Sequence, residues 1–95
     1  NQVEGAIIMA LTAATKPGIT LADGKVQQAN FDTAPVLRIN ETPPEINVLI
    51  LAEGGEKIKG VGEPGLPPFA PALCNAIFAA TGKRIRKLPV DITSI

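Results

Sequence analysis

The chain has 95 residues, of which 45% are hydrophobic and 19% charged, and nine Lys and Arg residues balance nine Asp and Glu residues to a formal net charge of zero. This composition argues against disorder, and a neutral chain with only three aromatic residues, all Phe, does not favour nucleic-acid binding. One cysteine and no histidine leave too few ligands for a zinc or iron–sulfur site within this chain.

A helix is predicted from Val3 to about Thr15, because apolar residues recur there at helical spacing, at Val3, Ala6, Ile7, Ala10, Leu11 and Ala14. Pro17 ends it, since proline cannot continue the hydrogen-bond ladder. Gln2 precedes the first turn, where its amide can reach a ligand or, by default, cap the helix or be solvated. The apolar run 6–14 is too short to cross a bilayer, so membrane insertion is not expected.

Three extended segments follow this helix. Asp23-Gly24 between short alternating runs predicts a hairpin with Leu21 opposite Val26. Residues 35–39 read as a short strand or an extended segment. Residues 45–51 read as a central strand covered on both faces, with Ile46, Val48 and Ile50 on one face and Leu49 and Leu51 on the other.

The segment Lys59–Pro68 holds one carboxylate, Glu63, among residues that control backbone shape. Gly60 and Gly62 can adopt positive φ and let a ligand approach the main chain, whereas Pro64 restricts Glu63 to extended conformations. A general base needs such fixed placement, which makes Glu63 a candidate catalytic residue. The alternative, a solvated acid in an ordinary turn, stays open.

Residues 52–59 are predicted to be a connecting loop, and a second helix is predicted after Pro68. Its apolar stripe consists of Ala70, Leu73, Cys74, Ile77, Phe78 and Thr81. Gly82 is placed to cap its C-terminal end. Cys74 is expected to be a buried, inert core thiol, and residues 85–95 are expected to pack as a tail.

These elements predict an α+β fold in which two helices pack on a small mixed or antiparallel sheet, with residues 1–95 forming one domain at most. The first helix is apolar on several sides and needs cover. We therefore expect the isolated chain to be aggregation-prone or only partly folded.

Two segments, 2–6 (Gln-Val-Glu-Gly-Ala) and 59–64 (Lys-Gly-Val-Gly-Glu-Pro), together resemble the molybdenum hydroxylases, the xanthine dehydrogenase and aldehyde oxidase family. Segments 30–38 and 76–84 look like the branch that includes isoquinoline 1-oxidoreductase large subunits and related bacterial aldehyde dehydrogenases. Gly65, where the xanthine-type pattern has proline, also favours this branch. The resemblance covers essentially the whole chain and implies a C-terminal segment of a much larger molybdopterin-binding subunit.

The resemblance implies an enzyme that hydroxylates a carbon of an aldehyde or N-heterocycle, with water as the oxygen source and a molybdenum-pyranopterin cofactor, expected as a cytosine dinucleotide. Glu63 falls on the family's general base, and Gln2 on a glutamine that contacts the cofactor. Lys59, Gly60, Val61 and Gly62 match positions that line the same side. No residue of this chain is expected to bind the metal directly.

The resemblance also implies partners, because the chain lacks a ferredoxin-like cysteine set and a flavin segment. We expect it to be inactive alone, and to need the rest of the large subunit and a small [2Fe–2S] subunit that carries electrons away. The non-enzymatic alternative is a free-standing α+β interaction or scaffold module that keeps the hydrophobic framework and binds no cofactor.

Overall fold

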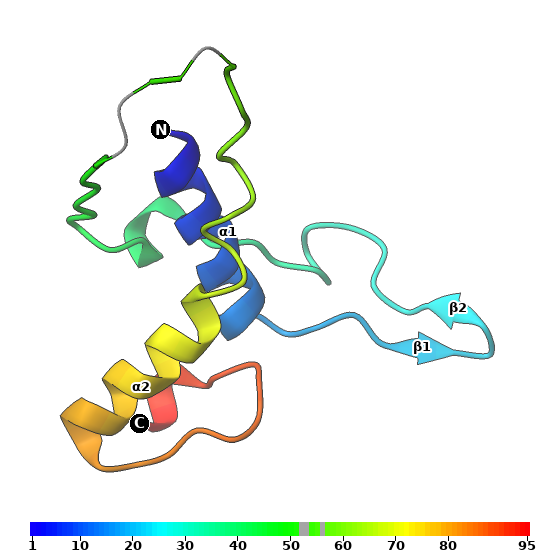
Figure 1. The fold of residues 1–95 in the computed structure, drawn as a ribbon. Coiled ribbons are helices and arrows are strands. Elements are labelled where there is room, and N and C mark those ends of the chain that lie inside the picture. Colours follow the sequence, from blue (N-terminus) through cyan, green and yellow to red (C-terminus); the bar gives the residue numbers. More distant parts are fainter. Residues whose placement is uncertain (52–53, 56) are drawn as a thin grey trace.

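The computed structural model describes residues 1–51, 54–55 and 57–95. In chain order the elements are α1 (Gln2–Thr15), β1 (Leu21–Ala22), β2 (Lys25–Val26), the 3-10 helix η1 (Ile39–Glu41), α2 (Phe69–Thr81) and the 3-10 helix η2 (Ile92–Ser94). The two long helices contact each other, and the hairpin projects away from them (Figure 1). Two helices and a small antiparallel sheet confirm the predicted α+β class.

Helix α1 buries four of the six residues in the stripe that its spacing predicts. Its buried residues are Ala6, Ala10, Leu11 and Ala14. The helix ends at Thr15 because Lys16, which precedes Pro17, adopts an extended conformation with φ −90° and ψ 152°. No helix in the described part of the chain is both long and apolar enough to span a bilayer.

The hairpin has the predicted register, with Leu21 opposite Val26 and Ala22 opposite Lys25. Its two-residue turn works because Asp23 and Gly24 both adopt positive φ, 50° and 72°. Leu21 is 71% exposed. The apolar side chains of Leu21 and Val26 are therefore left uncovered by the described residues.

Helix α2 ends as predicted, with Gly82 in the left-handed conformation at φ 73°. Only Ile77 of its predicted stripe is buried. Phe78 is 41% exposed and its ring lies 3.7 Å below the Arg84 guanidinium carbon. The prediction that Cys74 is a buried core residue is wrong in part, because the residue is only half-buried. The described residues leave that side of α2 open.

The C-terminal tail packs on α1, as expected. Val90 is 3% exposed, and its backbone N–H donates a 2.7 Å hydrogen bond to the carbonyl of Ala14. This contact uses a carbonyl at the end of α1 that has no partner within the helix. The small core therefore lies where α1, α2 and the tail meet.

The strand predicted at 45–51 is wrong, and of the two interpretations of 35–39 the strand is wrong. Residues 35–38 pair with no strand, Arg38 is extended, and Ile39 begins η1. Residues 45–51 likewise belong to no helix or strand. A strand exists only when a neighbour satisfies its backbone groups, and no described residue does so for either segment. Of the predicted loop 52–59, Ala52, Glu53 and Glu56 lie outside the described residues.

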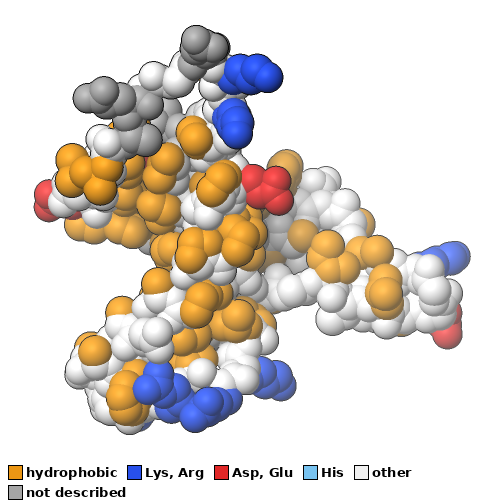
Figure 2. Space-filling view, in the orientation of Figure 1, with side chains coloured by type: hydrophobic (Ala, Val, Ile, Leu, Met, Phe, Trp, Pro, Cys, Tyr) orange, Lys and Arg blue, Asp and Glu red, His pale blue; other side chains and the backbone are white. Residues whose placement is uncertain are grey.

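Hydrophobic side chains occupy much of the visible surface (Figure 2). The exposed ones include large residues such as Leu49 at 81%, Leu51 at 84% and Ile58 at 101% of their full exposure. An apolar surface of this extent is typical of a chain that another surface covers.

Candidate functional site

Glu63 lies in a run of turns that leads directly into α2. The N–H of Leu66 donates to the carbonyl of Glu63 at 2.9 Å, and the N–H of Phe69 donates to the carbonyl of Leu66 at 3.3 Å. Pro64 follows Glu63 and limits its backbone. The carboxylate is thus carried by a loop that begins a helix, while its side chain stays exposed.

The structure brings Gln2 to this loop, although 59 positions separate it from Val61. The side-chain oxygen Oε1 of Gln2 accepts a hydrogen bond of 3.3 Å from the backbone N–H of Val61. The default reading of Gln2 as a helix cap is wrong, because Asn1 is the N-cap residue and Gln2 is already helical. Two of the segments that sequence reasoning singled out are therefore neighbours in space.

Gly65 holds the loop against α1. A Cβ atom at this position would lie 3.1 Å from the Cβ of Ala6 and 3.7 Å from the carbonyl oxygen of Val3. Any side chain at this position would require Ala6 to move by a few tenths of an ångström, so glycine allows the close approach. Sequence reasoning noted Gly65 as a departure from a pattern and missed this packing role, which depends on a contact 59 positions away.

Gly60 and Gly62 face open space. A Cβ atom at either would meet no other group within 4 Å, and neither adopts the positive φ that their presence suggested. With Glu63, Pro64 and Pro67 they line a hollow of about 450 Å³. Lys59 is exposed and does not line this hollow.

Within the described residues, the carboxylate of Glu63 makes no hydrogen bond or ion pair. The same residues contain no cluster of three or more His, Cys, Asp or Glu side chains that could hold a metal ion. The hollow beside Glu63 therefore offers a free carboxylate and accessible glycine backbone, and the amide side chain of Gln2 binds the neighbouring Val61. Such groups suit a cofactor whose metal ion is bound by atoms of the cofactor itself.

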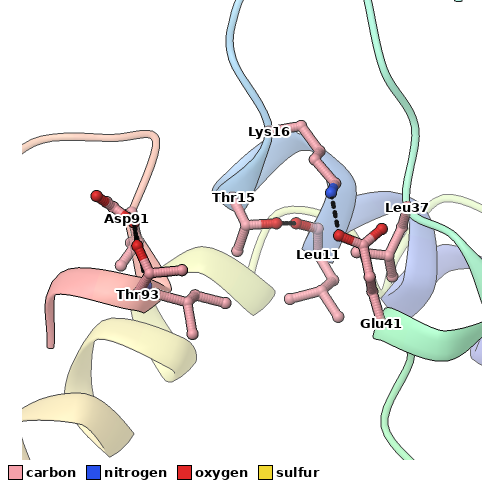
Figure 3. A pocket seen from close by; sticks show the side chains of 9 residues that line it. Leu11, Thr15, Lys16, Leu37, Glu41, Asp91 and Thr93 are labelled. Carbon is pink, nitrogen blue, oxygen red and sulfur yellow. Dashed lines mark hydrogen bonds and ion pairs between the residues drawn. The ribbon is translucent and has the colours of Figure 1, made fainter.

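A second hollow, of about 370 Å³, lies between α1, the 37–41 segment and the C-terminal tail (Figure 3). Its charged side chains already have partners. Lys16 pairs with Glu41, and the carboxylate of Asp91 accepts hydrogen bonds from Thr93 N at 3.0 Å and Thr93 Oγ1 at 2.6 Å. These paired side chains therefore indicate a structural role for this hollow and not a reactive site.

The Lys16–Glu41 pair has a defined pH dependence. The hydrogen bond from Lys16, followed by that from the backbone N–H of Arg38, lowers the pKa of Glu41 below its ordinary value of 4.5. Folding lowers the pKa of Glu41, so its ion pair with Lys16 stabilises the folded chain when the pH is above the ordinary pKa. This stabilisation is lost as the pH falls through the lowered pKa of the folded state.

Several bacterial proteins are similar to this chain. It is 38% identical to the isoquinoline 1-oxidoreductase subunit beta of Brevundimonas diminuta, over 94% of the chain and 11% of that protein. It is also 38% identical, over the same shares, to a membrane-bound aldehyde dehydrogenase (pyrroloquinoline-quinone) of Gluconacetobacter polyoxogenes. It is 31% identical to the aldehyde oxidoreductase molybdenum-binding subunit PaoC of Escherichia coli, over the whole chain and 14% of that protein.

The chain thus spans between a tenth and a seventh of the length of these relatives. No protein-family model and no solved structure matches it. The similarity, at 31% to 38% identity, extends over 94% to 100% of the chain. The chain belongs, as a segment, to the molybdenum hydroxylase family, in the branch of the isoquinoline and aldehyde oxidoreductase subunits.

Proposed function

We propose that residues 1–95 are the C-terminal segment of a molybdenum cofactor-binding domain, in a large subunit that hydroxylates an aldehyde or N-heteroaromatic carbon. The observation that carries this proposal is the 3.3 Å hydrogen bond between Gln2 and Val61, which joins the two sequence segments that resemble the family's cofactor contacts. The names of the relatives from Brevundimonas diminuta and Escherichia coli support the substrate classes.

The residues around Glu63 fit a cofactor whose metal is held by the cofactor itself. They provide hydrogen-bonding groups and open space beside Gly60 and Gly62. Among the described residues, no set of side chains could hold a metal ion. Gln2, Lys59, Gly60, Val61 and Gly62 are the residues that we assign to hold it. When bound, a molybdenum-pyranopterin supplies the redox chemistry by accepting two electrons from the substrate.

The role that we assign to Glu63 is that of general base. Hydroxylation with water as oxygen source converts R–H and H₂O into R–OH, two electrons and two protons. The exposed carboxylate has no competing partner among the described residues and is held by a loop packed on α1. It can therefore accept one of the two protons as the new carbon–oxygen bond forms.

The electrons must leave the site after each turnover. The described residues contain one free cysteine, Cys74, and therefore no iron–sulfur cluster of their own. We propose that a small [2Fe–2S] subunit accepts the electrons and that the pterin is a cytosine dinucleotide. On this account the isolated segment is inactive, because it holds only one wall of the site.

An isotope experiment tests the proposed reaction. The full-length subunit with its partner is supplied with isoquinoline and a dye as electron acceptor in H₂¹⁸O. We expect one ¹⁸O atom in each hydroxylated product molecule, measured by mass spectrometry. Oxygen derived from O₂ would contradict the proposal, and no oxidation of any aldehyde or N-heterocycle would favour the scaffold alternative.

A further inference from the structure

The segment that follows Gly82 holds a large share of the positive charge of the chain. Four of the nine Lys and Arg residues stand at positions 83–87 (Lys-Arg-Ile-Arg-Lys), with no acidic residue among them. All four of these side chains are exposed, and none forms an ion pair with another described residue. Figure 2 shows Lys and Arg side chains gathered at the end of the molecule where α2 lies. Their charge is therefore available to an anion.

One of these cations, Arg84, is held in place by α2. Its Nη1 donates a 3.0 Å hydrogen bond to Oδ1 of Asn75, and its guanidinium carbon lies 3.7 Å from the centre of the Phe78 ring. Asn75 and Phe78 are neighbours on one face of α2, because they are one helical turn apart. Stacking uses the face of the guanidinium, which leaves the other N–H donors along its edge for a ligand. A side chain that is already ordered loses less entropy on binding.

A hollow beside α2 brings this arginine together with two more cations. The hollow has a volume of about 440 Å³, and its lining includes Arg84, Arg86 and Lys87, together with Asn75 and the half-buried Cys74. No carboxylate of the described residues lines it. A concave surface lined by charges of one sign concentrates ions of the opposite sign. The hollow therefore favours an anionic ligand.

We propose that this hollow is a binding site for a phosphoryl group. Arg84 and Arg86 can each donate paired hydrogen bonds to the oxygen atoms of one anion, and Lys87 supplies a third positive charge. A phosphoryl group has about two negative charges at pH 7 and three acceptor oxygens, whereas a carboxylate has a single charge and fewer oxygens. Three cations around one hollow are therefore matched better by a phosphoryl group.

The segment 83–87 is expected to stay accessible in the full-length subunit. Hydrophobic side chains occupy much of the remaining surface, which suits contact with other parts of a subunit. The segment differs, because burying four unpaired cations away from water is strongly unfavourable. Glu63 precedes α2 and the segment follows it, and these 13 helical residues span about 20 Å. The phosphoryl site is thus separate from the proposed catalytic site, and neither inference depends on the other.

Calorimetric titration of the full-length subunit with inorganic phosphate, at constant ionic strength, tests the proposal. We expect a saturable phosphate site. Arg84→Gln and Arg86→Gln are each expected to weaken binding about tenfold or more, because each removes charge-assisted hydrogen bonds to the anion. The absence of saturable binding, or an unchanged affinity in both variants, would overturn the proposal.

Lys83→Gln is the matched control. It removes one positive charge from the same segment, at a position that does not line the hollow. The affinity for phosphate should change by no more than about twofold, because an exposed charge outside the hollow is screened by the salt. An equal loss of affinity in Lys83→Gln and Arg84→Gln would indicate a diffuse positive field and would overturn the site.

Cys74 provides an independent readout of where the anion binds. Its half-buried side chain lines the hollow, so bound phosphate should slow its alkylation by iodoacetamide, measured by mass spectrometry of the peptide that contains it. The slowing should follow the calorimetric binding curve and be absent in Arg84→Gln. Alkylation that saturating phosphate leaves unchanged would place the ion elsewhere and contradict the proposal.

Two further arms distinguish the sources of the phosphoryl group. A lipid headgroup predicts that the subunit sediments with vesicles of phosphatidylglycerol and phosphatidylcholine, that free phosphate competes, and that Arg84→Gln stays in the supernatant. A soluble source predicts phosphate binding without sedimentation. Either result retains the phosphoryl site. A subunit that binds polyglutamate but not phosphate would assign the hollow to carboxylates and overturn the proposal.

Discussion

Replacing Glu63 by glutamine in the full-length subunit is expected to slow reduction of the molybdenum centre by at least about a hundredfold, the usual cost of losing a general base. Glutamine keeps the size of the side chain and the turn before α2 but cannot accept the proton. The measurement is single-turnover reduction by an aldehyde or N-heterocycle, followed spectroscopically at matched molybdenum content.

Glu41→Gln is the control for this experiment. It makes the same chemical change at a carboxylate that is already paired with Lys16, in the hollow of Figure 3. We expect an unchanged rate for this variant. If Glu63→Gln also reacts at the wild-type rate, Glu63 only shapes the loop and is not the proton acceptor.

Valine at Gly65 is expected to destabilise the packing of the loop on α1 by about 1–3 kcal/mol, the usual cost of overpacking. The side chain would meet Ala6, whose Cβ is already 3.1 Å from the position of a Cβ at residue 65. In the cofactor-free full-length subunit, this loss should speed amide exchange in α1 by about 5- to 150-fold, if these amides exchange through opening of this contact.

Valine at Gly62 is the matched comparison. A Cβ atom there meets nothing within 4 Å among the described residues, so exchange in α1 should not change. If a cofactor occupies the open space, however, the molybdenum content of the Gly62→Val subunit should fall. Full molybdenum content in this variant would remove Gly62 from the proposed contacts, and equal exchange in the two variants would contradict the packing role of Gly65.

Features set by neighbouring residues could be predicted from the sequence. Pro17 and Gly82 end the helices where expected, and Asp23-Gly24 sets the hairpin register. Each depends on the backbone preferences of one or two residues, so a short stretch of sequence contains the information. The buried stripe of α1 was predictable for the same reason, because helical spacing is a local property.

Features set by distant contacts could not be predicted in this way. Residues 45–51 have a strand pattern, but pairing requires a neighbour that the described chain does not provide. The burial of Cys74 depends on cover that the described residues likewise leave open. No spacing rule indicates that Gln2 meets Val61, or that Gly65 meets Ala6. The resemblance brought Gln2 and Glu63 into one hypothesis, and the fold supplies the contact between their segments.

The molybdenum content of the full-length subunit, purified from its native host with its cofactor intact, tests the central claim most directly. The proposed function predicts about one molybdenum atom per subunit by elemental analysis, together with a pterin released on denaturation. A subunit without molybdenum would contradict the claim, whether it contains no cofactor or contains pyrroloquinoline quinone, the compound after which the Gluconacetobacter polyoxogenes relative is named.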